Sequence, residues 1–144
     1  MAIGYAIDEA RGLVFIRLWG EITEAVLMEH AAALRSDERF DAFHDLLVDL
    51  RGASIRSVSA EFLRRFRSPF DRDARRALIV NDLATFGMAR MYGLLHAGDE
   101  SIAVVEDPAD ALRRLSLPEG YILPKLLDFV LDAGQERGVA GWRA

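Results

Sequence analysis

The sequence contains no cysteine. Disulfide bonds, thiol nucleophiles and cysteine-ligated metal ions are therefore excluded, and a reducing compartment fits this composition. No run reaches the roughly 18 consecutive apolar residues that a transmembrane helix needs, so we expect no integral membrane association. The first twelve residues, MAIGYAIDEARG, lack the basic start and the apolar centre of a signal peptide. We therefore expect a cytoplasmic protein.

Motifs of common enzyme classes are also missing, since the sequence has no GxGxxG, GxxxxGK[ST], GxSxG or HExxH. The three histidines, His30, His44 and His96, are dispersed and none has a second histidine at metal-ligand spacing. Asp45 and Asp49 are spaced to share one face of a strand, but an aspartate at a strand end more often hydrogen-bonds the next loop. We expect no catalytic residue, no metal site, no cofactor and no enzymatic activity.

A chain of 144 residues fits one domain and is long enough to bury a hydrophobic core. The pattern of apolar residues predicts the strands of this domain. Alternating and β-branched residues predict strands over 3–7 and 13–19. The short polar segment ending at Gly12 joins these two strands as an antiparallel hairpin. Three later apolar runs predict further strands at 45–50, 77–80 and 101–107.

Helices are predicted between the later strands. Thr23 is a candidate N-cap, with Ile22 and Leu27 spaced as a hydrophobic staple. Asn81-Asp82 and Asp107-Pro108 are starts for two later helices. The predicted helices span about 24–35, 59–67 with Phe62 and Phe66 facing inward, 83–96, a segment from 108, and 125–133. This order predicts an α/β fold with a mixed sheet of about five strands, an N-terminal hairpin and helices mainly on one face.

Positive charge is concentrated in one part of an acidic chain. The net charge is −5, yet residues 51–76 hold eight arginines and three acidic residues, which is +5 and leaves −10 for the rest. Such an uneven distribution of charge indicates which partners a protein can bind and says little about its fold. The negative net charge argues against nucleic-acid binding. A solvated helix face is the simpler interpretation. The functional alternative is a face for an acidic protein or an anion, because the arginine fork matches carboxylate and phosphate.

The loop after the strand at 45–50 carries three serines, Ser54, Ser57 and Ser59. The simpler interpretation of Ser57 and Ser59 is that they are N-cap candidates before AEFLRRF. A phosphorylation switch or a site of chemistry are the alternatives. We predict that this loop and the following helix form the binding face for a partner or an anion, with these residues: Arg51, Arg56, Ser57, Ser59, Arg64, Arg65 and Arg67.

The element order, the strand ending in VDL and the serine loop before a helix together resemble the STAS domain, the fold of bacterial anti-sigma-factor antagonists. More specifically, ARRALIVNDLATFGMARMYGLL followed by SIAVVEDPADALRRL is similar to the bacterial SpoIIAA-like (STAS/SEC14) family. In STAS antagonists the switch is a serine within an Asp-Ser-x-Gly-like motif. Counted from Asp49, that aspartate falls on Ser57 and the switch serine on Val58, so the regulatory serine is not carried over.

The resemblance covers about residues 3 to 117 and implies a non-enzymatic, regulatory protein-interaction module whose partner is unknown. The SEC14 part of the family name implies an alternative, a protein that binds a small apolar or lipid-like ligand. We accordingly expect a domain over 1–117 and a helical extension and tail over 118–144. That extension carries an apolar stripe, which must pack against another apolar surface: Leu126, Leu127, Val130 and Leu131. A homodimer interface and packing on its own sheet both remain open.

Overall fold

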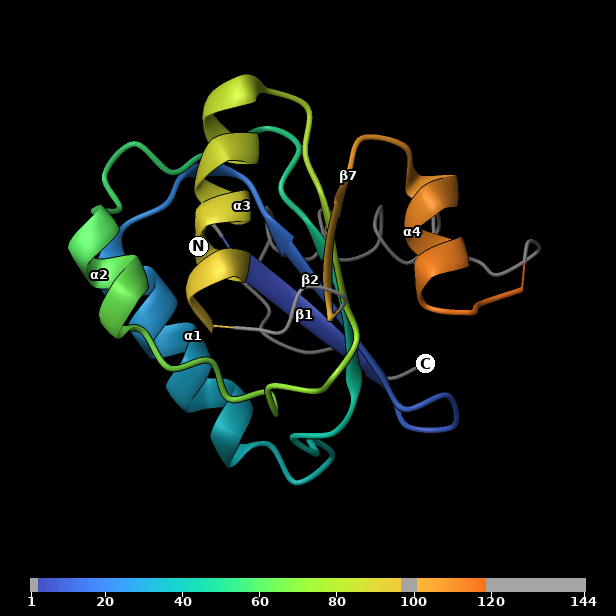
Figure 1. Ribbon diagram of the computed structural model, residues 1–144. Helices are drawn as coiled ribbons and strands as arrows, with labels where there is room; N and C mark the ends of the chain where they lie inside the picture. The colour runs from blue at the N-terminus through green and yellow to red at the C-terminus, as the bar shows by residue number, and fades with distance from the viewer. Residues whose placement is uncertain (1–2, 97–100, 119–144) are drawn as a thin grey trace.

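The computed structural model describes residues 3–96 and 101–118 and is built around a five-stranded mixed sheet with the order β1-β2-β4-β6-β7 (Figure 1). β1 and β2 are antiparallel, whereas all later neighbours are parallel. The predicted mixed sheet with an N-terminal hairpin is confirmed. The strands are β1 (Ile3–Asp8), β2 (Leu13–Leu18), β4 (Asp45–Asp49), β6 (Arg76–Ile79) and β7 (Ile102–Val105).

A second, two-stranded parallel sheet was not predicted. It joins β3 (Gly20–Glu21) to β5 (Ala53–Ser54), and the Ile22 amide also donates to the Ser54 carbonyl at 2.8 Å. The pair ties the segment after β2 to the loop after β4. Gly20 adopts a positive φ of 69°, a conformation that glycine tolerates best, so the chain turns there between β2 and β3.

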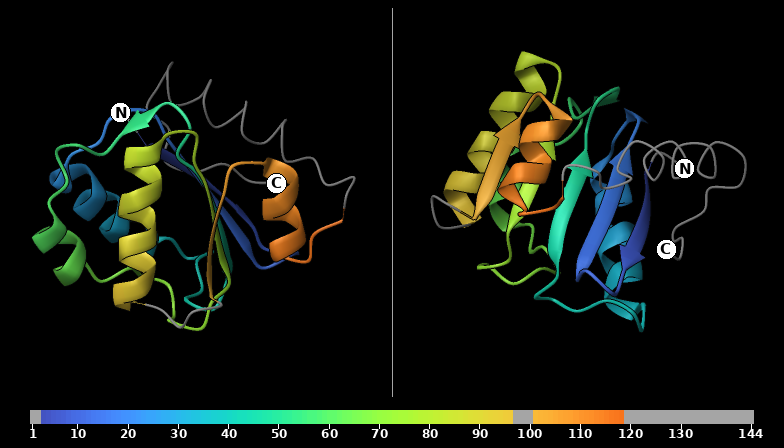
Figure 2. Two further views of the ribbon diagram at one scale, coloured as in Figure 1. Left: turned by 45° about the horizontal axis from the view of Figure 1, so that its top comes forward. Right: turned by 90° about the vertical axis from the view of Figure 1, so that its right-hand side faces the viewer.

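Among the described residues, three helices lie on one side of the large sheet and a fourth covers the other side (Figures 1 and 2). They are α1 (Glu24–Ser36), α2 (Ala60–Arg65) and α3 (Leu83–His96) on the first face and α4 (Pro108–Arg114) on the second. The prediction of helices mainly on one face is therefore confirmed. No helix among residues 3–96 and 101–118 has the length and apolar character needed to cross a bilayer.

Each face of the sheet has its own buried cluster, because successive strand residues point to opposite faces. On β2, Val14 and Ile16 belong to the cluster below α1, while Leu13 and Phe15 belong to the cluster below α4. A strand buried on both sides is nearly all apolar, which is why the run of apolar β-forming residues predicted its position well.

The predicted caps of α1, α3 and α4 are found. The Thr23 hydroxyl accepts from the Val26 amide at 3.2 Å, and Asp82 and Asp107 accept from amides in the first turns of α3 and α4. Pro108 occupies the first turn of α4, where its missing N–H costs nothing. The predicted helix over 125–133 and the tail lie outside the described residues.

The second helix differs from the prediction over 59–67. α2 is only six residues long, and its buried residue is Leu63. Phe62 and Phe66, predicted to face the core, are only half-buried and stack on each other with ring centroids 5.3 Å apart. The reason is that α2 packs on α3 rather than on the sheet, so Phe66 meets Tyr92 of α3 instead.

Candidate functional site

The serine loop lies at the carboxyl ends of the parallel strands, where α/β proteins often bind ligands. Ser59 is the N-cap of α2, because its hydroxyl accepts from the Phe62 amide at 3.0 Å. Ser57 is not a cap: its hydroxyl donates to Glu21 Oε1 at 2.6 Å. The Ser59 amide donates to Glu24 Oε2 at 2.8 Å. The hydroxyl of Ser57 thus fastens the loop to β3, and the amide of Ser59 fastens it to the first residue of α1.

The arginines of the predicted binding face have different surroundings. Arg64 and Arg65 are exposed and both pair with Glu61, Arg65 through Nε at 2.8 Å. Arg51 is partly buried and bound to Asp49, whereas Arg56 is exposed at the loop. The Arg67 carbonyl accepts from Arg35 Nη2 at 2.7 Å. Internal pairing therefore already offsets part of the charge of this face, and its role in binding stays a prediction.

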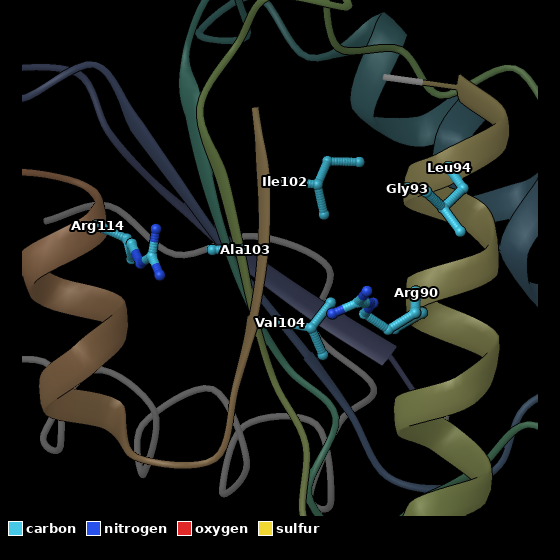
Figure 3. A pocket seen from close by; sticks show the side chains of 8 residues that line it. Arg90, Gly93, Leu94, Ile102, Ala103, Val104 and Arg114 are labelled. Carbon is cyan, nitrogen blue, oxygen red and sulfur yellow. The ribbon is translucent and has the colours of Figure 1, made fainter. Parts of the chain in front are cut away.

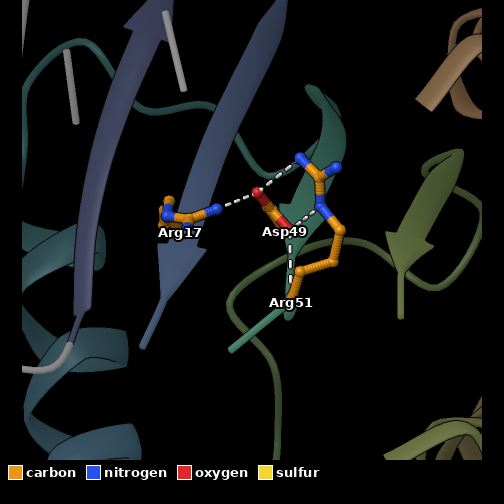
Figure 4. A network of polar contacts seen from close by, with 3 residues as sticks. All are labelled: Arg17, Asp49 and Arg51. Atoms are coloured by element: carbon orange, nitrogen blue, oxygen red, sulfur yellow. Dashed lines mark hydrogen bonds and ion pairs between the residues drawn. The ribbon is translucent and has the colours of Figure 1, made fainter. Parts of the chain in front are cut away.

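Asp49 is the centre of a buried ion-pair network (Figure 4). Its carboxylate is fully buried and accepts from the Arg17 guanidinium, from the Arg51 amide at 3.0 Å and from Arg51 Nε at 2.9 Å. Arg17 and Asp49 are paired neighbours across β2 and β4. Asp45, at the other end of β4, is bound by Arg75 at 2.7 Å. Each aspartate is thus held by arginine, and the acid–base pair considered from the sequence is not formed.

An open groove of about 510 Å³ lies between the serine loop and the start of α3. Its walls include Ile55, Arg56 and Val58 from the loop and Met88 from α3. Leu83, the first residue of α3, is 88% exposed, and its neighbours Asp82 and Ala84 line the groove. Amide and hydroxyl donation from Thr85 lowers the pKa of Asp82, so this carboxylate is ionised at neutral pH. The groove has an apolar side and one charge of each sign.

A second groove, of about 340 Å³, runs beside the edge strand β7 (Figure 3). Among the described residues, β7 has a hydrogen-bonded neighbour on one side only. Arg90 of α3 and Arg114 of α4 stand on opposite sides of the strand. Arg90 also lies 5.9 Å from the ring centroid of Phe86, so its charge is partly engaged on its own helix.

The third hollow is a pocket of about 170 Å³ between the sheet, α1, α3 and the loop before β6, and it is open to the surface like the two grooves; it is called the cavity below. Its lining is mostly apolar and belongs to the main core cluster: Ile3, Ile16, Leu18, Leu34, Leu46, Val48, Leu50 and Phe70. Leu27, His30 and Ala31 of α1 complete one wall, and Phe66, Ser68 and Pro69 form another. No residue of the predicted binding face lines it.

One charged side chain lines this cavity. Arg76, at the start of β6, is only 5% exposed. Its Nη2 donates to the Arg72 carbonyl at 3.0 Å, but its Nε has no hydrogen-bond partner, and burial lowers its pKa. Within residues 3–96 and 101–118, no carboxylate forms an ion pair with it. The guanidinium nevertheless stays charged, because arginine does not deprotonate in proteins.

His30 contributes a second unpartnered polar atom to the cavity wall. Its Nε2 is buried and has no hydrogen-bond partner, and its ring meets Tyr5 edge-on at 5.6 Å. Burial lowers the pKa of His30 to about 4, so the imidazole is neutral at pH 7. Of the side chains that line the cavity, Arg76 therefore carries the only positive charge at that pH.

Comparison with known proteins gives neither a family nor an activity. No protein-family model matches the chain, and no curated protein is similar to it. Among solved structures, the chain is similar to an uncharacterized protein of Shewanella loihica, described as a DUF3478 family member with a SpoIIAA-like fold. The TM-score is 0.47 at 19% identity, covering 79% of this chain and 92% of the other.

Proposed function

We propose that this protein is a non-enzymatic binding protein that holds a small, largely apolar molecule in the cavity between the sheet and α1. The observation that carries the proposal is the cavity itself, about 170 Å³ within the main core cluster. Protein interiors leave few voids larger than a water molecule. An apolar cavity of about 150 Å³ accepts benzene. A molecule of that size matches the space.

The position of the cavity also provides a way in. Three of its walls are regular elements, the sheet, α1 and α3, but the fourth is the loop segment 66–70 between α2 and β6. Loops open locally at a lower free energy than packed strands and helices. A ligand can therefore enter past Phe66 and Pro69 without separation of the sheet from α1.

Filling the cavity should abolish binding. Ala31 of α1 is 1% exposed and lines the cavity, so Ala31→Leu places a larger side chain where the ligand would lie. We expect the wild-type protein to bind fluorobenzene, which ¹⁹F NMR line broadening and a rise in melting temperature would detect. Ala31→Leu should bind fluorobenzene at least tenfold more weakly.

The matched control is Ala33→Leu, the same change on the exposed face of the same helix, which should bind as wild type does. A smaller change, Ala31→Val, serves if the leucine overpacks the core. No binding by wild type, or equal binding by a folded Ala31→Leu protein, would refute the proposal.

A second candidate function is the protein-interaction module implied by the sequence. The observation that favours it is Leu83, which is 88% exposed at the start of α3 and lies between Asp82 and Ala84, two residues that line the same groove as the exposed Arg56. An apolar anchor beside an arginine is typical of protein contact surfaces. The partner would offer an apolar side chain and an acidic group to the loop that carries Ser57 and Ser59.

Substitution of both groups should remove such a partner. The test uses a partner protein that is captured by the wild type and then purified. The double variant Leu83→Ser, Arg56→Glu should bind this partner with at least tenfold lower affinity. The triple variant Arg64→Glu, Arg65→Glu, Arg67→Glu extends the test to α2, and Arg113→Glu on α4 is the control from the other face of the sheet. Equal affinity of all variants in surface plasmon resonance would refute the role of this face.

A further inference from the structure

We propose that the ligand of this cavity is a small monocarboxylic acid, whose carboxylate binds the Arg76 guanidinium and whose apolar body fills the space between the sheet and α1. The inference rests on the proposed function and adds the chemical class of the ligand. It depends on one buried charge, on the count of charges around it and on the size of the cavity.

Among the described residues, no carboxylate forms an ion pair with the buried Arg76, and Asp71 acts on it only as a more distant negative charge. A buried ion is normally paired, because transfer of a charge into an apolar interior is costly. Arg17 shows the usual solution in the same sheet: its side chain is 15% exposed and is bound by the fully buried Asp49. Arg76 is at least as buried, yet only the Arg72 carbonyl accepts from it. An anion in the cavity would supply the missing partner.

The charge count selects a monoanion. His30 is neutral at pH 7 because burial holds its pKa at about 4, so the guanidinium is the one positive group in the lining. A carboxylate carries a single charge and matches a guanidinium in a two-bond geometry. A phosphate monoester carries about −1.5 to −2 at pH 7 and would leave excess negative charge against apolar walls. The Nε of Arg76 is buried without a hydrogen-bond partner, so one donor of the guanidinium is still unsatisfied.

The volume selects a body of about the size of benzene. The cavity measures about 170 Å³, and most of its other lining residues are apolar, with His30, Ser68 and Tyr92 as the exceptions. Those walls provide few hydrogen bonds, so the part of the ligand away from Arg76 must be apolar. Benzoate and hexanoate both combine one carboxylate with a body of this kind.

The experiment compares an acid with a neutral compound of the same shape. Isothermal titration calorimetry of the full chain with benzoate and with benzyl alcohol should give at least tenfold tighter binding of benzoate. Arg76→Met keeps an unbranched side chain as far as the position of Nε and removes the charge, so it should weaken benzoate binding by at least tenfold and leave benzyl alcohol binding unchanged or tighter. Arg72→Met, an exposed neighbour on the preceding loop, should behave as wild type.

The outcomes separate the two proposals. If benzyl alcohol binds as tightly as benzoate, the carboxylate inference fails while the apolar site stands. If neither compound nor hexanoate binds, the site itself fails. Melting curves give an independent readout, because ligand-free Arg76→Met should be at least as stable as wild type once an unpaired charge is removed. A clear loss of stability would make Arg76 a structural residue and overturn the inference. Arg76→Lys, which keeps the charge, should bind benzoate more tightly than Arg76→Met does.

Discussion

Replacing Asp49 with alanine should lower the free energy of unfolding by about 3–5 kcal/mol, the range for removal of one partner of a buried ion pair. The carboxylate is fully buried and compensates two guanidinium groups, those of Arg17 and Arg51. Its loss removes the carboxylate that both guanidinium groups share and also frees the Arg51 amide that starts the loop. Urea denaturation followed by circular dichroism measures the change directly.

Two further variants test whether charge is the cause. Asp49→Asn keeps an acceptor for the Arg51 amide and should cost less than Asp49→Ala. The double variant Arg17→Met, Asp49→Leu removes the closest pair together and should recover much of the loss, because an apolar replacement of a buried pair is often neutral. Glu61→Gln, in the exposed pairs of α2, should change stability by less than about 1 kcal/mol. Equal small effects at Asp49 and Glu61 would show that the buried network contributes no more than a surface pair.

Local patterns predicted the large sheet well for a physical reason. β4 lies between β2 and β6 in a sheet covered on both faces, so its residues had to be apolar almost without interruption. β3 and β5 were missed because two residues each, Gly-Glu and Ala-Ser, carry no periodicity. Their pairing follows from the approach of two loops, which only the tertiary fold creates.

Residue preferences for helix N-caps predicted the role of only one of two serines in the serine loop. Ser57 and Ser59 are equally good N-caps by residue type, and only Ser59 precedes the helix by the correct distance. The acceptor of Ser57 is Glu21, 36 residues earlier in the chain. A contact of that sequence separation has no signal in the local sequence, so the role of Ser57 could not be derived from it.

The candidate cavity was hidden by a similar ambiguity. Arg75 and Arg76 are adjacent and were counted together in one basic segment. The direction of β6 separates them: Arg75 is half-exposed and binds Asp45, while Arg76 points into the core below α1. Two neighbouring strand residues must face opposite sides, but the sequence does not say which of the two arginines is inside. The volume of the cavity depends on the packing of α1 and segment 66–70, which no local pattern encodes.

The second large effect concerns the opposite face of the sheet. Phe15→Ala should lower the free energy of unfolding by about 3–5 kcal/mol, as is usual for removal of a buried phenylalanine ring. Phe15 is 1% exposed on β2 and belongs to the cluster that includes Ala111 and Leu112 of α4. The deletion removes apolar contacts and leaves a void that a rigid sheet cannot close. Chemical denaturation measures the loss.

The position of Phe15 makes a local consequence testable as well. α4 has only seven residues, too few for a helix to be stable alone, so its order depends on Ala111, Leu112 and Leu115 packing on the sheet. Phe15→Ala should therefore increase amide hydrogen exchange in α4 more than in α1. Leu34→Ala, an equally buried position on the other face, should reverse this order. Uniform exchange changes in both variants would show that the two clusters open as one cooperative unit, with α4 held by more than this face of the sheet.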